Sequence, residues 1–271
     1  MASEPAADRF LALHRPGRPL LMPNPWDRGS AKLLESLGFE ALATTSSGFA
    51  ATLGRLDGMV TREEAIAHAA QIVDAVDVPV SADLENCFAD DPAGVAETVR
   101  LAVEAGLAGC SVEDFSGREG QAIYDAGPAA ERVTAAAEAA HSGPRRLVLT
   151  ARAENHVHGV DDLADTIARL QSFQEAGADV LFAPGLRRLE QIREVLSSVD
   201  LPVNVLVVGG MPTVSELAEA GVSRISVGGS FAYAAYGAAV AAGRELLEPG
   251  TYGYSESAGI GAKAVREAFD G

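Results

Sequence analysis

The chain of 271 residues has few lysines and few basic residues relative to its acidic ones. Only Lys32 and Lys263 occur, and neither lies at the end of an expected strand. A Schiff-base aldolase, which needs a lysine amine in its active site, is therefore nearly excluded. Lysine and arginine together number 21 against 38 acidic residues, and the net charge of −17 argues against nucleic acid or an anionic membrane as partner.

The sequence also has little cysteine and no long apolar run. Cys87 and Cys110 cannot build a disulfide framework, and they fit a reducing cytosol as inert small side chains. The first ten residues, MASEPAADRF, lack the basic and apolar regions of a signal peptide. No uncharged apolar segment approaches the roughly 20 residues of a membrane span. We therefore expect a soluble, cytoplasmic protein.

Short apolar segments rich in β-branched residues alternate with helical patterns along the chain. The expected strands are 20–23, 41–45, 79–83, 108–113, 147–152, 178–182, 202–206 and 223–227. The expected helices are 29–37, 62–75, 92–105, 128–140, 161–176, 187–197, 213–220 and 231–247. Eight such βα units without a change of pattern predict an α/β fold of the (β/α)8, TIM-barrel type.

The length fits one such barrel, so residues 1–271 are expected to form a single domain. The barrel is expected over about 18–247. The tail, 248–271, is rich in glycine and then turns helical from Ala262. We expect this C-terminal helical extension to pack on a neighbouring subunit.

Charged residues follow three neighbouring strands at the point where each strand ends. Asp83 and Glu85 end PVSADLE, Glu113 ends AGCSVED, and Arg152 ends LVLTAR. The carboxyl ends of the strands form the active-site face of a barrel. Carboxylates that converge there need a cation between them, and Mg²⁺ takes oxygen ligands of this kind. An arginine beside that cation would hold an anionic substrate.

Each of these roles has an alternative. Asp83 and Glu85 could be a helix cap and a solvated charge, and Arg152 could be a structural partner of Glu113 or Glu154. Asp57, in an Asp-Gly pair, is equally consistent with a fourth acid at the metal and with a turn residue. His156, in the loop after Arg152, could move protons or simply face solvent.

Together these motifs and their order resemble the isocitrate lyase / phosphoenolpyruvate mutase superfamily over nearly the whole chain. They are LLMPNPWD (20–27), TTSSG (44–48), SADLE (81–85), SVED (111–114), TAR (150–152), PVN (202–204) and ISVG (225–228). The resemblance implies a Mg²⁺-dependent barrel, with Mn²⁺ as a possible substitute, and a homo-oligomer, a dimer or a tetramer with exchanged C-terminal helices.

The resemblance also implies roles for individual residues. Asp83 would bind Mg²⁺ directly, while Asp57, Glu85 and Glu113 would hold its waters. Arg152 would bridge the substrate and Glu113. The substrate's carboxylate end would contact Trp26, Asp27 and the backbone at Ser46, Ser47 and Gly48, with Asn204 on the opposite rim.

The loop at 115–125, FSGREGQAIYD, departs from the family pattern. It lacks the Lys-Lys/Arg-Cys-Gly-His motif of the lyases and the Lys-Asp-Asn-type gate of the phosphonate-forming mutases. The usual Asp-x-Asp-x-Gly-Tyr-Gly is here DLENCFA (83–89). These departures indicate a subgroup with its own substrate. We expect the loop to close over the site as a lid.

The resulting hypothesis is an enzyme, a Mg²⁺-dependent lyase or hydrolase. It would cleave a C–C bond of a small 2-oxo or 2-hydroxy di- or tricarboxylate through an enolate-like intermediate. One alternative is P–C chemistry on phosphonopyruvate or phosphoenolpyruvate. Another, of a different class, is a barrel that binds a metabolite without turning it over.

Overall fold

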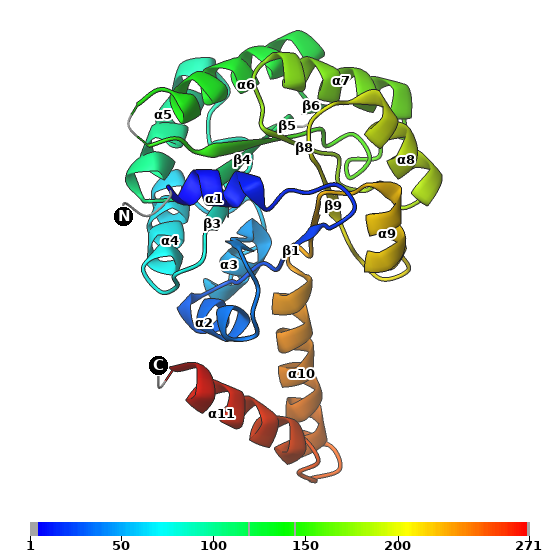
Figure 1. Ribbon diagram of the computed structural model, residues 1–271. Coiled ribbons are helices and arrows are strands. Elements are labelled where there is room, and N and C mark those ends of the chain that lie inside the picture. The colour runs from blue at the N-terminus through cyan, green and yellow to red at the C-terminus, as the bar shows by residue number, and fades with distance from the viewer. Residues whose placement is uncertain (1–4, 119, 144, 270–271) are drawn as a thin grey trace.

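Eight parallel strands curl into a barrel in the computed structural model, which describes residues 5–118, 120–143 and 145–269 (Figure 1). The strand order is β1-β10-β9-β8-β7-β4-β3-β2. The Ala43 N–H donates to the Pro23 carbonyl at 3.1 Å, which brings the edge strands β1 and β2 together. The (β/α)8 architecture expected from the sequence is therefore confirmed.

The barrel strands lie close to their expected positions and are mostly shorter. They are β1 (Leu20–Met22), β2 (Leu42–Ala43), β3 (Val80–Asp83), β4 (Gly109–Glu113), β7 (Val148–Arg152), β8 (Val180–Phe182), β9 (Val203–Leu206) and β10 (Arg224–Ser226). The helices expected between the strands are α2 (Arg28–Ser36), α4 (Arg62–Val73), α5 (Pro92–Glu104), α6 (Ala126–His141), α7 (Leu163–Glu175), α8 (Leu189–Ser198), α9 (Val214–Ala220) and α10 (Ser230–Leu247).

Local sequence signals explain where several helices begin and end. Thr61 and Glu64 form a capping box at the start of α4, and Thr213 and Glu216 form one at the start of α9. Each box satisfies backbone N–H groups that the first turn leaves without a partner. Gly221 ends α9 in the left-handed region, at a φ of 99°, which glycine adopts without strain.

A short N-terminal helix, α1 (Ala6–Ala12), covers the end of the barrel where the strands begin. Its Phe10 is fully buried against residues at the starts of β1, β7 and β8. The packing is tight because a Cβ at Gly109 would come within 2.7 Å of the Phe10 ring. The sequence did not predict this helix, which seals the barrel opposite the active-site face.

Three further elements differ from expectation. The segment after β2 forms α3 (Ser46–Thr52), which was not predicted. The loop at 115–125 contains an antiparallel hairpin of β5 (Phe115–Arg118) and β6 (Gln121–Ile123). The C-terminal helix α11 (Ser255–Phe269) begins seven residues before Ala262, so the expected start was wrong.

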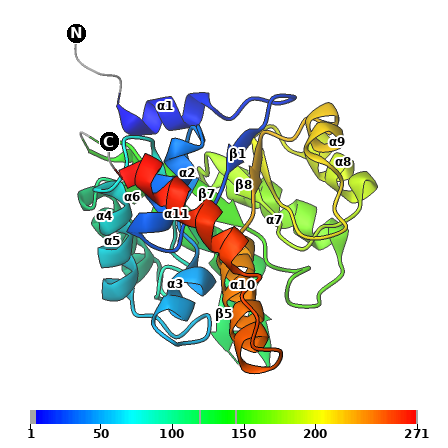
Figure 2. The ribbon, with the colours of Figure 1, turned by 90° about the horizontal axis from the view of Figure 1, so that it is seen from below.

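Helices α10 and α11, the C-terminal arm, extend away from the barrel (Figures 1 and 2). Helix α10 leaves the barrel after β10, and α11 folds back so that it contacts α2. Ala232 is the one residue buried in α10, and no described residue of α11 is buried. Large apolar side chains of the arm are exposed, among them Tyr233, Val240 and Ile260.

Cys87 and Cys110 are unpaired and fully buried. Burial raises the pKa of the Cys87 thiol to about 12, and it also raises that of Cys110 well above its usual value. Both therefore stay protonated and serve as small core side chains. Among the residues described, no helix is long and apolar enough to cross a membrane.

Candidate active site

An arginine at the end of β7 lies among three carboxylates. The Arg152 guanidinium is 2.8 Å from Asp83 Oδ1, 3.0 Å from Glu113 Oε2 and 2.8 Å from Glu154 Oε1. Strands β3, β4 and β7 are neighbours in the sheet, so their carboxyl ends deliver these groups to one place. The convergence expected from the strand ends is present.

Arg152 stays protonated, and therefore positively charged, in this position. Burial alone would disfavour the charged form, but Glu154, Glu113 and Asp83 together raise the pKa of Arg152 well above its usual value. The guanidinium also lies 5.3 Å from the centre of the Phe182 ring. A permanently cationic, preorganised fork therefore faces the pocket.

Negative charge exceeds positive charge at the carboxyl ends of these strands, which form the rim of the barrel. Burial, followed by the charges of Asp83 and Asp57, raises the pKa of Glu85 to about 7. Burial also raises the pKa of Glu113, although Arg152 opposes the shift. Asp57 is exposed as a residue, yet desolvation of its carboxyl and the charge of Asp83 raise its pKa. The rim would gain electrostatic stabilisation from one more cation.

The donor set suits a hard divalent ion. Asp57, Asp83, Glu85 and Glu113 offer only oxygen atoms, which Mg²⁺ prefers. Within the described part of the chain, no three Asp, Glu, His or Cys side chains are already arranged to enclose an ion. Mg²⁺ commonly binds through one or two carboxylates and keeps several waters, so the residues fit an ion held mainly by Asp83.

The backbone around Asp83 and Glu85 is shaped for this placement. The Asp83 N–H donates to the Thr44 hydroxyl at 2.9 Å, and the Ser46 N–H donates to Asp83 Oδ2 at 3.2 Å. Glu85 has a φ of 50°, which is unusual for a residue with a side chain. Strained positions of this kind are common at functional sites.

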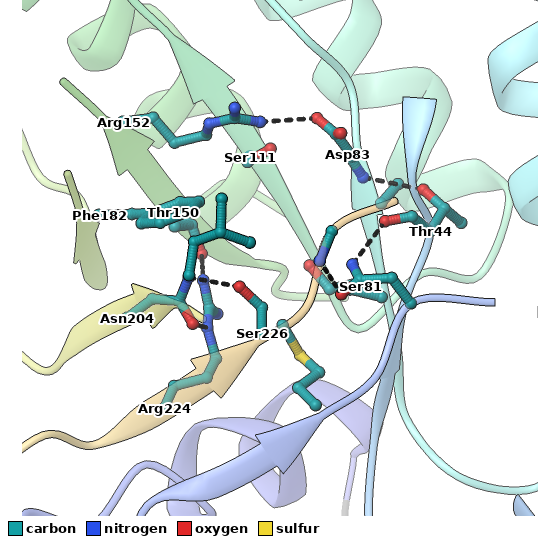
Figure 3. Close-up of a pocket in the computed structure, with 16 residues that line it drawn as sticks. Thr44, Ser81, Asp83, Ser111, Thr150, Arg152, Phe182, Asn204, Arg224 and Ser226 are labelled. Atoms are coloured by element: carbon teal, nitrogen blue, oxygen red, sulfur yellow. Dashed lines mark hydrogen bonds and ion pairs between the residues drawn. The ribbon is translucent and has the colours of Figure 1, made fainter. Parts of the chain in front are cut away.

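A pocket runs from this rim into the barrel (Figure 3). Asp83 and Arg152 line it near the rim, where a dashed line in the figure joins them. Below them the lining includes polar side chains from four strands, namely Ser111, Thr150, Asn204, Ser226 and Arg224. Polar side chains therefore lie beneath the rim, beside apolar ones such as Met22 and Leu206.

Asn204 is deeper than the resemblance implied. It is buried in β9, where its amide donates to the Ser226 hydroxyl at 2.9 Å and its carbonyl oxygen accepts from Arg224 Nε at 3.0 Å. The expectation that Asn204 lies on the opposite rim was wrong. It lines the inner part of the pocket and holds the side chain of Arg224.

The other expected substrate-binding residues surround the start of α3. Ser46, Ser47 and Gly48 form its first turn, and a Cβ at Gly48 would lie 3.2 Å from Trp26 Cβ. Asp27 caps α2 by accepting from the Ser30 N–H at 2.7 Å. Of these residues, none lines the pocket described above, so their contact with substrate stays a prediction.

His156 lies away from the pocket. Its Nδ1 is 3.3 Å from Asp161 Oδ1, and the residue does not line the pocket. The structure therefore does not bring His156 to Arg152 and Asp83. The predicted lid, which contains the β5–β6 hairpin, is anchored by Arg118, 2.5 Å from Asp90 Oδ2. Closure of this segment stays a prediction.

Sequence reasoning missed two parts of the site. Glu154 was considered only as a structural partner of Arg152, although it is buried and completes the group of three carboxylates. Arg224 was not singled out, although it is a lone charge inside the apolar segment SRISV. A charge within an expected core strand was the signal that could have found it.

The chain is similar to proteins of one well-populated family. Residues 10–247 match the sequence model described as Phosphoenolpyruvate phosphomutase. A solved structure from Burkholderia cenocepacia J2315, named only provisionally as a lyase/mutase, is 49% identical with a TM-score of 0.90. The match covers 93% of this chain and 91% of that one. An uncharacterised protein of Mycobacterium tuberculosis is 32% identical over 255 residues, or 91% of this chain and 93% of the relative.

Proteins named for an activity are more distant. The 2-methylisocitrate lyase of Escherichia coli (strain K12) is 28% identical over 235 residues, 79% of this chain and 78% of the lyase. The structure of 2,3-dimethylmalate lyase, a PEP mutase/isocitrate lyase superfamily member, is 26% identical with a TM-score of 0.83, covering 99% and 100%. Oxaloacetate acetylhydrolase, solved with its product oxalate, is 25% identical with a TM-score of 0.83, covering 93% and 90%.

Proposed function

Because the chain belongs to the phosphoenolpyruvate phosphomutase family, we propose that it is a Mg²⁺-dependent lyase or hydrolase of small 2-oxo or 2-hydroxy acids. The bond it cleaves is a C–C bond of a di- or tricarboxylate, by way of an enolate-like intermediate. The more distant relatives support this class, because their names refer to methylisocitrate, dimethylmalate and oxaloacetate.

The observation that carries the proposal is the single arginine among the rim carboxylates. Arg152 has a side chain that is only 16% exposed, and its contacts with Asp83, Glu113 and Glu154 hold it in one orientation. A fixed, partly desolvated guanidinium stabilises negative charge that develops on a substrate oxygen. It also recognises a carboxylate through two parallel hydrogen bonds.

The carboxylates have complementary roles in the proposal. Asp83 would contact Mg²⁺ directly, while Asp57, Glu85 and Glu113 would hold its waters. Mn²⁺ is expected to substitute. The ion would polarise the 2-oxo group and lower the free energy of the charge left by bond cleavage. Glu113 also orients Arg152. Because His156 does not line the pocket, we do not assign the proton donor to it.

The turn after β10 bears on the alternative of P–C chemistry, which would need a phosphate-binding site. A phosphate-binding turn needs free N–H groups, but the N–H groups of Val227 and Gly228 both donate to Asn24 Oδ1, at 3.0 and 2.9 Å. These two N–H groups are therefore not available to a phosphate.

A substrate panel tests the proposal. The protein is incubated with 2-oxo and 2-hydroxy acids and with phosphonopyruvate, with Mg²⁺ or with EDTA, and pyruvate, glyoxylate, oxalate and phosphate are measured. We expect Mg²⁺-dependent release of an oxo acid or oxalate. Release of phosphate alone would favour the P–C alternative. Tight binding of oxalate without any turnover would favour a non-catalytic barrel.

We also propose that the protein works as a homo-oligomer in the cytoplasm. In a dimer or a tetramer, a second subunit would cover the exposed apolar side chains of the C-terminal arm. The two free thiols suit a reducing compartment. Light scattering of the full chain and of a chain ending at Gly229 gives the number of subunits of each, and equal numbers would contradict the role given to the arm.

A further inference from the structure

Arg224 in β10 is a buried charge without a carboxylate partner among the residues that the structure describes. It is 3% exposed. Its Nε donates to Asn204 at 3.0 Å, one terminal nitrogen donates to the Thr150 hydroxyl at 3.1 Å, and the other lies 3.2 Å from His14 Nε2. All three acceptors are neutral groups. A guanidinium has five N–H donors, so two remain without a hydrogen bond in the described part of the chain.

The tautomer of His14 confirms that this partner is neutral. Arginine only donates, so His14 Nε2 must accept, and Nδ1–H then donates to the Phe10 carbonyl at 2.9 Å. Burial, followed by the charge of Arg224, lowers the pKa of His14 to about 3. The imidazole therefore brings no negative charge to Arg224.

An uncompensated buried cation is costly, and the positive charge of Arg152 makes the cost larger. Removing a charge from water costs several kcal/mol unless an opposite charge repays it. Burial, followed by the positive charge of Arg152, lowers the pKa of Arg224 to about 9. Both effects indicate an electrostatic environment that an anion between the two arginines would stabilise.

An anion between Arg152 and Arg224 would lie inside the pocket, directly beneath the rim. Arg224 and Arg152 line the same pocket, as Figure 3 shows. Thr150, which accepts from Arg224, precedes Arg152 by two residues on β7, so both side chains face the barrel interior. Two residues along a strand span about 6–7 Å. The two arginines therefore face different depths of one pocket, as the receptors for the two ends of a short dicarboxylate would.

We infer that Arg224 is the receptor for a second carboxylate of the substrate, so that the pocket selects four- or five-carbon dicarboxylates over monocarboxylates. The inference rests on the proposed function, in which the rim holds the 2-oxo end. The second carboxylate accepts hydrogen bonds from the two remaining N–H donors of Arg224. The hydroxyl of Ser226, which lines the same pocket, is a further polar contact for it.

The competing explanation is that Arg224 is only a structural link between α1 and the barrel. It does connect His14, which follows α1, to β7 and β9. A structural link would affect the stability of the protein and all ligands alike. A carboxylate receptor affects only ligands that carry the second charge.

Matched ligands separate these explanations. Oxaloacetate and 2-oxobutanoate differ by a carboxylate in place of a methyl group, as do 2-oxoglutarate and 2-oxopentanoate. Their dissociation constants are measured with Mg²⁺ by calorimetry, or as inhibition constants if one of them is turned over. In the wild type, at least one dicarboxylate is expected to bind about tenfold or more tightly than its partner, the effect of a charge-assisted hydrogen bond.

Two variants and one control complete the experiment. Arg224→Met removes the charge, and Asn204→Asp supplies an internal carboxylate that neutralises Arg224 while keeping it in place. Both are expected to reduce the dicarboxylate preference to about onefold. His14→Gln changes the structural partner but keeps the charge of Arg224, and it should keep the preference. If Arg224→Met does not fold, Asn204→Asp decides.

Failure of this inference can be told apart from failure of the proposed function. A preference that is absent in the wild type, or unchanged in both variants, overturns the inference even if the enzyme cleaves 2-oxo acids. A preference that is lost in the variants supports it even if no ligand is turned over, in which case only the proposed reaction fails.

Discussion

The two arginines of this pocket differ in how their buried charges are compensated. Arg152, at the rim, is surrounded by three carboxylates, whereas Arg224 has only neutral acceptors. We call the inner end of the pocket, around Arg224, the floor. At the rim the protein itself supplies excess negative charge, which suits a metal ion. At the floor it supplies a positive charge, which suits an anion. The two ends of the pocket therefore select for different partners.

Asp83→Ala tests the rim most severely. Loss of this carboxylate is expected to lower kcat/KM by about a thousandfold or more and to remove the dependence on Mg²⁺, since charge-stabilising groups have effects of this order. The fold should persist because Asp83 lies outside the core, even though its pair with Arg152 is lost. Circular dichroism checks the fold, and Glu131→Ala, on the exposed face of α6, is the control. A variant that keeps a kcat/KM close to that of the wild type, with or without Mg²⁺, would contradict the proposed role.

Arg152→Lys tests the geometry of the rim at constant charge. Lysine keeps the positive charge but cannot contact Asp83, Glu113 and Glu154 through one planar fork. We expect a loss of about 2–4 kcal/mol in transition-state stabilisation, measured as kcat/KM. The exposed Arg100→Lys is the control. A variant with the wild-type rate would make Arg152 a structural partner only.

Replacing each arginine by methionine compares the two ends in stability. Arg152→Met leaves three carboxylates without their cation and should lower the free energy of unfolding by about 3–5 kcal/mol. Arg224→Met loses three hydrogen bonds but also removes an unpaired buried charge, so its effect should stay within about 2 kcal/mol. Urea unfolding at neutral pH without Mg²⁺ measures both. Equal losses would mean that the two charges are compensated to the same degree.

His14 makes the floor sensitive to acid. Because burial lowers its pKa from 6.5 to about 3, only the unfolded chain binds a proton between these values. Unfolding is therefore favoured as the pH falls below 6.5, by about 2 kcal/mol at pH 5. His14→Gln removes this contribution, so the wild type should lose more stability than the variant between pH 7 and pH 5. Parallel pH profiles would show that His14 is not held neutral.

The sequence predicted the rim well for a physical reason. In a parallel sheet the strands are apolar runs that end abruptly where the chain meets solvent, so Asp83, Glu113 and Arg152 could be placed at strand ends. Their convergence then followed from the fold alone. Glu85 and Asp57 were also placed near this group. Burial raises the pKa of both carboxyls, and the charge of Asp83 adds to the shift.

The floor could not be predicted in the same way. Both faces of a barrel strand are buried, so the alternation of polar and apolar residues that would show which way a side chain points is lost. Asn204 was therefore placed on the rim, and Arg224 received no role. Helix α3 was missed because the segment SSGFAAT is short and contains residues of low helix propensity. The position of His156 depends on a loop, which the strand pattern does not constrain.

The link between His14 and Arg224 also has a consequence for how the chain is made. These residues lie 210 positions apart, and β1 finds its partner β10 at the same place, with Leu20 opposite Arg224. As the chain leaves the ribosome, β1 cannot pair with β10 until most of the sequence has been synthesised. Contacts of such long sequence separation slow folding and leave apolar strand edges exposed in the interim. We therefore expect the pocket to form last, at barrel closure, and newly made chains to need protection from aggregation until then.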